Sequence, residues 1–168
     1  MSSTIIRPAV PDDVVPLTEL YNDYILKTTI TFDVTPYTVE RRRETWFNHY
    51  KATGRHRLFV AEFNSNLIGY ATSSQFRTKA AYDTSVETSI YLHPDAHGQG
   101  LGTRLYETLF TALKAEDVHR AYAGITLPNS KSIALHEKFG FQSVGRYREV
   151  GRKFDRYWDV EWYEKGLR

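Results

Sequence analysis

Apolar residues in the first part of the chain recur at helical spacing after a short β-branched run. Residues 4–7 predict a strand, and the acidic turn at 11–13 predicts a helix start, because carboxylates stabilise a first helical turn. Apolar positions with the spacing of one helix face follow, namely Val14, Leu17, Leu20, Tyr21, Tyr24 and Ile25. Residues 28–33 are β-branched and aromatic, which indicates an extended segment or a loop.

A second helix is predicted over residues 38–50. Its apolar positions fall roughly on one face and are Val39, Trp46, Phe47 and Tyr50. Its polar face carries Arg41, Arg42 and Arg43. We expect this arginine triplet to be a solvated face rather than an anion site, since charge runs usually face water.

The middle of the chain changes to the two-residue alternation of strands. Residues 57–63 and 67–73 predict a hairpin, with Asn64-Ser65-Asn66 as its turn. Residues 85–92 predict a third strand, which ends before Pro94 because proline cannot donate to a strand ladder. Its two faces alternate, with Val86, Thr88, Ile90 and Leu92 on one side and Glu87, Ser89 and Tyr91 on the other.

The rest of the chain alternates helices with strands. Helices are predicted over 103–117 and 129–139, and strands over 120–126 and 158–163. The first helix continues a stripe of leucines four residues apart, at Leu101, Leu105, Leu109 and Leu113. The second is expected to end at Gly140 as a C-cap, with Phe141 as the hydrophobic contact that follows.

A hairpin followed by alternating helices and strands indicates an α/β (α+β) fold, with a mixed central β-sheet flanked by helices. The 168 residues contain no solenoid-length repeat and no long Pro/Gly/Ser linker, so we expect a single domain over residues 1–168. Hydrophobic residues make up 41% and charged residues 25% of the chain, which is typical of a globular protein rather than a disordered one.

Composition removes several classes of function. A formal net charge of +2 gives no reason to expect a nucleic-acid partner. The chain has no cysteine, which excludes a disulfide framework, a thiolate zinc site and a cysteine nucleophile. No metal site is expected, because the remaining histidines lack ligand spacing and are expected at the surface; they are His49, His56, His93 and His119.

The location expected from sequence is cytoplasmic, with no membrane contact. The apolar runs are too short to span a bilayer, and the N-terminus lacks the pattern of a signal peptide. The aromatic share is high, at 14%, and these side chains suit a core, a small-molecule pocket or a subunit interface. Composition does not choose among the three.

Gly98, Gly100 and Gly102 lie between a predicted strand and a predicted helix. Alternating glycines permit positive φ angles and the close approach of a ligand. The helix that follows offers unpaired N–H groups and the positive end of its dipole, a combination that suits phosphate. The spacing matches neither the dinucleotide fingerprint nor the Walker pattern. The alternative is a turn that only connects strand to helix.

The context of these glycines resembles a known family. Residues 89–105 read Ser-Ile-Tyr-Leu-His-Pro-Asp-Ala-His-Gly-Gln-Gly-Leu-Gly-Thr-Arg-Leu. They resemble the acetyl-CoA motif of the GCN5-related N-acetyltransferases (GNAT), Arg/Gln-x-x-Gly-x-Gly/Ala, with His97 where Arg or Gln is usual. Residues 129–141 are similar to the family's Asn-x-x-Ser/Ala helix that ends in Gly-Phe. The resemblance implies the GNAT fold and acetyl-CoA as co-substrate.

Within that superfamily the chain resembles the branch of phosphinothricin and methionine sulfoximine or methionine sulfone acetyltransferases. The similarity runs almost end to end, through residues 6–9, 21–25, 28–32, 81–83, 86–92, 150–154 and 158–160. The resemblance implies acetylation of the α-amino group of a small amino-acid analogue by a cytoplasmic homodimer. The aromatic residues Phe154, Tyr157, Trp158 and Trp162 suit such an interface, although core packing would use them equally well.

Two residues are candidates for proton transfer. An α-amine is mostly protonated at neutral pH, so a base must remove a proton before it attacks. Glu87 matches the branch's proposed catalytic glutamate, on the strand that leads into the glycine turn. His136 stands where many superfamily members carry a tyrosine, and it is expected to protonate the thiolate or to assist Glu87. Without the resemblance, an exposed glutamate and a packed histidine are the ordinary interpretations.

The resemblance also implies binding residues. The acetyl-CoA pyrophosphate is expected on backbone N–H groups of the turn, and the pantetheine arm on the strand edge and on the helix that follows Asn129. The expected residues are Ile90, Tyr91, Leu92, His97, Gly98, Gln99, Gly100, Leu101, Gly102, Thr103, Asn129 and Ser132. In the acceptor pocket, Arg77 and Lys79 resemble the branch's basic pair, and arginine can hold a carboxylate or phosphinate. Phe32, Tyr82 and Val150 are expected to shape its apolar wall.

Two other functions stay open at this point. One is acetylation of a peptide or protein N-terminus, which needs an open groove rather than a small closed pocket. The other is a non-catalytic acetyl-CoA-binding module, which could dispense with Glu87 and His136.

Overall fold

The computed structural model describes residues 3–168 of the chain. Its strands are β1 (Ile5–Pro8), β2 (Arg57–Phe63), β3 (Asn66–Gln75), β4 (Ser85–Leu92), β5 (Arg120–Thr126), β6 (Gln142–Lys153) and β7 (Arg156–Gly166). Its helices are α1 (Val14–Lys27), α2 (Val39–Thr45), α3 (Leu101–Lys114) and α4 (Ser130–Lys138). Short 3₁₀ turns occupy Pro11–Asp13, Phe47–His49, Ala80–Tyr82 and Pro94–Ala96.

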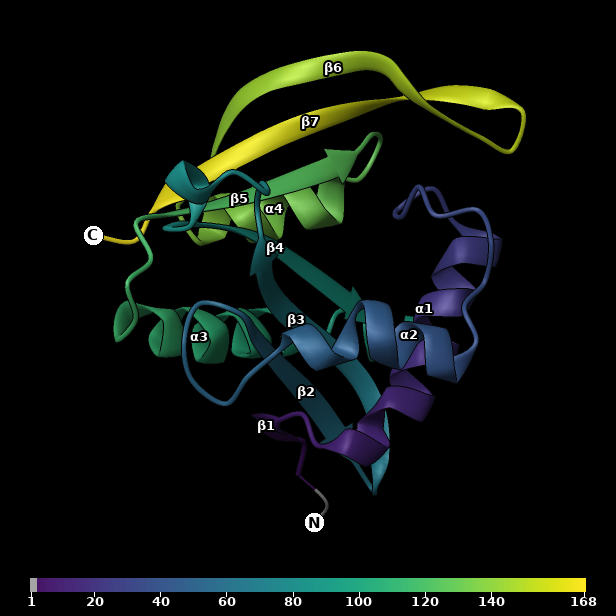
Figure 1. Ribbon diagram of the computed structural model, residues 1–168. Coiled ribbons are helices and arrows are strands. Elements are labelled where there is room, and N and C mark those ends of the chain that lie inside the picture. Colours follow the sequence, from purple (N-terminus) through teal and green to yellow (C-terminus); the bar gives the residue numbers. More distant parts are fainter. Residues whose placement is uncertain (1–2) are drawn as a thin grey trace.

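The strands of residues 3–168 form one seven-stranded sheet in the order β1-β2-β3-β4-β5-β7-β6. All neighbouring strands run antiparallel except β4 and β5, which are parallel. Helices α1 and α2 lie on one face of this sheet, and α3 and α4 lie on the other (Figure 1). The predicted mixed sheet flanked by helices is confirmed.

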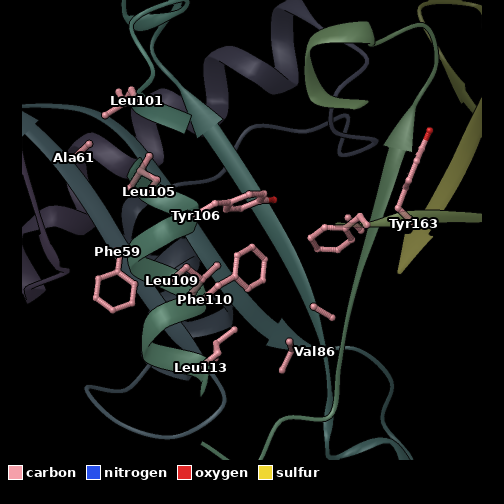
Figure 2. Packing of buried hydrophobic residues seen from close by; sticks show 14 of the residues in the cluster. Phe59, Ala61, Val86, Leu101, Leu105, Tyr106, Leu109, Phe110, Leu113 and Tyr163 are labelled. Atoms are coloured by element: carbon pink, nitrogen blue, oxygen red, sulfur yellow. The ribbon is translucent and has the colours of Figure 1, made fainter. Parts of the chain in front are cut away.

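The main core lies between α3 and the sheet. The leucine stripe is buried as its four-residue spacing predicts, with exposed fractions of 4% for Leu101 and 0% for Leu105, Leu109 and Leu113. Figure 2 shows this stripe turned toward the strands, with Val86 of β4 in the same cluster. A second cluster packs α1 against β2 and β3 through Leu17, Leu20 and Tyr70. The two faces of β4 are thereby fixed: Val86 and Thr88 point toward α3, and Glu87 and Ser89 point toward α1 and α2.

The two turns that sequence assigned are also present. Asn64 and Ser65 adopt positive φ angles of 49° and 61°, as the tight turn of a twisted hairpin requires. Gly140 has a φ of 82°, and the Phe141 N–H donates to the carbonyl of His136. Phe141 is 2% exposed, which confirms the C-cap and its hydrophobic contact.

Three predicted elements differ from the structure. The helix expected over 38–50 ends at Thr45, because Trp46 leaves helical geometry (φ −139°, ψ −60°) and packs edge-on against Tyr50 and Tyr70. The helix expected over 103–117 spans Leu101–Lys114, and the last strand is longer than 158–163. Tertiary packing and pairing partners, which no local pattern contains, set these ends.

Strand β6 was not predicted at all. Its residues are exposed along almost the whole strand, so no buried face imposes an alternating pattern. Bulges between Ser143 and Gly145 and between Tyr147 and Gly151 shift its register twice, which removes the two-residue period that identifies a strand.

No helix among residues 3–168 has the length and apolar character needed to cross a membrane.

Candidate active site

The site is organised by a gap in the sheet. Strands β4 and β5 pair in parallel over only three residue pairs, the last being Glu87 with Tyr122. Beyond this point β4 continues to Leu92 beside β3, while β5 continues beside β7. The facing edges of β4 and β5 therefore lose their strand partners, and backbone polar groups without a partner are available to a ligand.

Glu87 stands at the start of this gap and lines a cavity of about 520 Å³. Strand alternation turns its side chain away from Val86 and toward the α1 face. Burial raises the pKa of the Glu87 carboxyl above its ordinary value, and the positive charge of Arg77 opposes that rise. A half-buried carboxylate with a raised pKa in a cavity has the properties of a general base.

Arg77 lines the same cavity as Glu87. Its guanidinium lies over the ring of Phe76 at 4.5 Å and near Trp162 at 5.8 Å. The cavity thus contains one carboxylate and one cation on aromatic support, which suits an acceptor that has both an amine and a carboxylate.

Phe32 and Val150, which the resemblance places in an acceptor pocket, line this cavity and come from opposite ends of the chain. The Phe32 ring lies so close to Gly151 that a Cβ at this position would clash with Phe32 Cε2. The Lys153 ammonium, 5% exposed, donates to the Thr31 carbonyl at 2.8 Å. The β6–β7 hairpin is therefore fixed against the loop after α1, and Gly151 is essential to that contact.

Lys79 and Tyr82 lie elsewhere. Lys79 is exposed, and Tyr82 is 44% exposed with its ring edge-on to Phe76 at 6.1 Å. Neither lines the cavity of Glu87. Their assignment to the acceptor pocket stays a prediction.

His136 lies on the opposite side of the gap. It is 3% exposed and lines a small hollow of about 50 Å³ together with Asn129 and Ser132. That hollow and the Glu87 cavity share Ser89, Tyr91 and Gly124 among their walls. The two candidate proton-transfer residues thus reach adjoining spaces from different faces of the sheet.

The protonation state of His136 follows from its contacts. Its Nδ1 lies 2.7 Å from the Ser132 carbonyl, which only accepts, so Nδ1 carries the proton. Its Nε2 is therefore the acceptor for the Tyr106 hydroxyl at 2.9 Å. Burial lowers the pKa of His136, and its bond to the Ser132 carbonyl opposes this only in part. These contacts and the lowered pKa favour a neutral imidazole that carries its proton on Nδ1.

The glycine turn matches its prediction at two of three positions. Gly98 and Gly100 have φ angles of 79° and 72°, and nothing lies within 4 Å of a Cβ at either position. Gly102 is helical instead, and a Cβ there would approach Leu135 Cδ2 at 3.1 Å. Gly102 therefore serves close packing between α3 and α4, whereas the first two glycines shape an open turn before the N-terminus of α3.

The expected pantetheine residues border the gap, with two details that the sequence does not contain. The Leu92 carbonyl already accepts a hydrogen bond from the Tyr24 hydroxyl at 2.7 Å. The Asn129 side-chain oxygen caps α4 by accepting from the Ser132 N–H at 3.2 Å, which leaves its amide NH₂ for a ligand. Ile90, Tyr91, Asn129 and Ser132 all line the small hollow at the gap.

A second cavity of about 450 Å³ adjoins the cavity of Glu87 and is lined by Arg42. Arg42 is 5% exposed, so the expectation that the arginine triplet is a solvated face was wrong for its middle residue. Its guanidinium packs over the rings of Tyr21 at 3.8 Å and Trp46 at 3.9 Å, and these contacts bury it beneath α2. His56, expected at the surface, is half-buried and lines this cavity.

Sequence reasoning missed several residues of the site. Tyr21, Tyr147 and Trp162 line the Glu87 cavity, and Gly151 makes room for Phe32. The strand pattern at 158–163 was the available signal for Trp162. Tyr147 and Gly151 gave none, because β6 carries no regular period.

Sequence comparison relates this chain to known acetyltransferases. A family model described as an acetyltransferase (GNAT) domain matches residues 6–162. The chain is 56% identical over 164 residues to the phosphinothricin N-acetyltransferase of Streptomyces coelicolor, covering 96% of this chain and 95% of that protein. It is 31% identical over 165 residues to the L-methionine sulfoximine/L-methionine sulfone acetyltransferase of Pseudomonas aeruginosa, covering 98% and 95%.

The fold is also similar to that of a solved acetyltransferase structure. The crystal structure of a phosphinothricin acetyltransferase from Sinorhizobium meliloti in complex with acetyl-CoA has a TM-score of 0.88 and 32% sequence identity. The similarity covers 98% of this chain and 88% of that one.

The lowered pKa of His136 is open to measurement. We expect its ring protons to titrate in NMR with a pKa below the ordinary value of about 6.5, since burial disfavours the imidazolium. The signal is assigned by its loss in a His136→Gln variant. Because the folded-state pKa is lowered, this group costs stability only as pH falls below the unfolded-state pKa. A pKa at or above 6.5 would contradict the neutral tautomer.

Proposed function

The chain belongs to the GNAT acetyltransferases, in the phosphinothricin N-acetyltransferase branch, and we propose that it acetylates the α-amine of a small amino-acid analogue. The acceptors that we propose are phosphinothricin, methionine sulfoximine and methionine sulfone. The observation that carries this proposal is the cavity of about 520 Å³ that places Glu87 and Arg77 together at the gap between β4 and β5. A cavity of that size accommodates a small amino acid.

The gap fits acetyl-CoA, which supplies an acetyl group activated as a thioester. The open turn at Gly98 and Gly100, with no atom within 4 Å of a Cβ at either position, leaves room for a pyrophosphate. The 14-residue helix α3 follows directly, and its first N–H groups and dipole favour such an anion. The unpaired edge of β4 at Ile90 and Tyr91 would hold the pantetheine arm, and the Asn129 amide would donate to it.

Glu87 is the general base of the proposed mechanism. The raised pKa of the Glu87 carboxyl lies closer to the pKa of an α-ammonium group. Proton transfer from the ammonium to Glu87 is therefore less unfavourable than transfer to an ordinary carboxylate. Arg77 would hold the α-carboxylate of the acceptor and so orient the amine toward Glu87. Phe32, Val150 and Trp162 would enclose the side chain and exclude water.

His136 assists proton transfer as a relay. Its Nε2 accepts a hydrogen bond from the Tyr106 hydroxyl, so a proton released on the acceptor side would reach it through that hydroxyl. The imidazolium that forms is a ready donor, because burial lowers the pKa of His136. It then returns the proton to the departing thiolate and recovers its neutral tautomer.

We also propose that the protein is a homodimer, joined through the β6–β7 hairpin. Within residues 3–168, strand β6 pairs only with β7 and is open along its other edge, and an open edge favours association. Figure 1 shows this hairpin extending past the end of β5. Apolar side chains are exposed on it, with fractions of 52% for Val144, 53% for Phe154 and 60% for Tyr157. Trp162, by contrast, packs over Gly124.

The test of the proposed function is CoA release from acetyl-CoA with a panel of acceptors. The panel holds phosphinothricin, methionine sulfone, methionine sulfoximine, the common amino acids, a polyamine and a peptide with a free N-terminus. We expect saturable turnover with the first three and none with the peptide. Activity on the peptide alone would establish the N-terminal acetyltransferase alternative. Acetyl-CoA binding without turnover across the panel would indicate a binding module.

For Glu87→Gln we expect kcat to fall by roughly 10²- to 10⁴-fold, as is usual for the loss of a general base. The Kd for acetyl-CoA should stay within twofold of wild type, because Glu87 faces the acceptor cavity. Calorimetric titration and steady-state kinetics measure the two quantities. The matched control is Glu107→Gln, which makes the same change at an exposed position of α3. Unchanged turnover in Glu87→Gln would remove this residue from the mechanism.

The dimer is tested by light scattering on the purified protein. We expect a mass of twice the 19.5 kDa chain. The double variant Val144→Glu, Tyr157→Glu should be monomeric, because charges on both strands oppose burial of the hairpin. A monomeric wild-type protein at micromolar concentration would contradict the proposal.

A further inference from the structure

The cavity beneath α2 shares walls with the Glu87 cavity, which is the proposed acceptor site. Its volume is about 450 Å³. Three residues, Tyr21, Ser89 and Tyr91, belong to its walls and to those of the Glu87 cavity. Of these, Ser89 comes two residues after Glu87 on the same face of β4. A molecule with its amine at Glu87 and a side chain that follows β4 would therefore point toward this second space.

Arg42 supplies this space with a buried positive charge. Its side chain takes part in no ion pair within residues 3–168. Its Nε is buried without a hydrogen-bond partner in that part of the chain. The rings of Tyr21 and Trp46 stabilise the cation through their faces, but a guanidinium has five N–H donors to satisfy. Buried charges are normally paired, so the site favours an anion.

The carboxylate that could neutralise Arg42 is engaged elsewhere. Asp33 lines the same cavity, yet its Oδ2 accepts hydrogen bonds from the hydroxyls of Tyr21 at 2.6 Å and Tyr37 at 3.3 Å. It forms no ion pair with Arg42 within 4.0 Å among the residues described. The two tyrosine hydroxyls bind the Asp33 carboxylate, and the Arg42 guanidinium therefore stays available to an anionic ligand.

A second donor without a partner lies in the same wall. Tyr70 is 1% exposed, it lines the cavity, and its hydroxyl is buried with no partner among residues 3–168. Three further hydroxyl side chains line the same cavity, those of Thr72, Ser74 and Ser89. One buried cation and several hydroxyl donors around one space are the arrangement that recognises an oxyanion.

We propose that Arg42 and Tyr70 bind the anionic end of the acceptor's side chain and so select acceptors with a charged phosphinate or carboxylate there. This inference rests on the proposed function, in which the amine lies at Glu87 and the α-carboxylate at Arg77. Residues two apart on a strand are separated by roughly 6.6 Å. Four bonds separate the amine nitrogen of phosphinothricin from its phosphorus, and the phosphinate oxygens lie one bond further, which takes them along β4 from Glu87 toward Ser89.

Two acceptors of nearly the same shape test the proposal. Phosphinothricin and methionine sulfone both end in a methyl group on an atom that carries two oxygens, and only the phosphinate is charged. For Arg42→Gln we expect kcat/KM to fall roughly 10- to 100-fold with phosphinothricin, the range of a lost hydrogen bond to a charged group. With methionine sulfone we expect a fall of less than about fivefold, since a neutral sulfone gains less from a cation.

Two further variants separate recognition from folding. Tyr70→Phe should lower kcat/KM for phosphinothricin about three- to tenfold, because a hydrogen bond to an anion is lost, while Tm is unchanged or higher because a buried unpaired hydroxyl is removed. Arg41→Gln is the control, because it removes the same charge from an exposed position of α2. It should leave the ratio of the two acceptors unchanged.

Failure of this inference can be told apart from failure of the proposed function. If wild type acetylates neither compound, the proposed function fails. Suppose instead that wild type is active. If Arg42→Gln and Tyr70→Phe then lower kcat/KM equally for both acceptors, or for neither, the inference is overturned. A final measurement uses inorganic phosphate. If phosphate raises the Tm of wild type but not of Arg42→Gln, and Arg42→Gln keeps the wild-type preference between the two acceptors, the cavity binds a separate anion. That result also overturns the inference.

Discussion

The parallel pairing of β4 and β5 stops after three residue pairs, and the functional geometry depends on that early stop. A fully paired sheet would satisfy every backbone group of both strands and leave no entry between them. Here each strand keeps a partner on its outer side only, β3 for β4 and β7 for β5. The gap is stable because α3 closes one face with an apolar core, including four buried leucines, and α1 covers part of the other.

Strand alternation then divides the chemistry between the two faces. Glu87 turns toward α1 and the larger cavity, while His136 reaches the gap from α4 on the opposite face. Each group has a different electrostatic environment. Burial keeps the Glu87 carboxyl basic, and the same effect keeps the His136 imidazole neutral. In the proposed reaction Glu87 would take a proton from the amine and His136 would return one to the thiolate, from either side of the reacting atoms.

The walls of the Glu87 cavity come from segments far apart along the chain. The loop after α1 contributes Phe32, and the hairpin at the other end contributes Val150 and Trp162. Contact between the two depends on Gly151 and on the Lys153 ammonium, which donates to the Thr31 carbonyl. The hairpin therefore does two things at once. It closes the cavity, and it presents an exposed apolar edge on its outer side.

Local patterns in the sequence determined most of the fold and part of the site. The leucine stripe, the Asn64-Ser65 turn, the alternation around Glu87 and the turn at Gly98 and Gly100 each act over a few residues, and each was predictable. Family resemblance then singled out Glu87 and His136, and their catalytic roles remain predictions. Only the tertiary structure decided which arginine of the triplet is buried, where α2 ends and how β6 is formed. These depend on contacts between residues far apart in the chain, and burial, pairing and cavity walls are properties of such contacts.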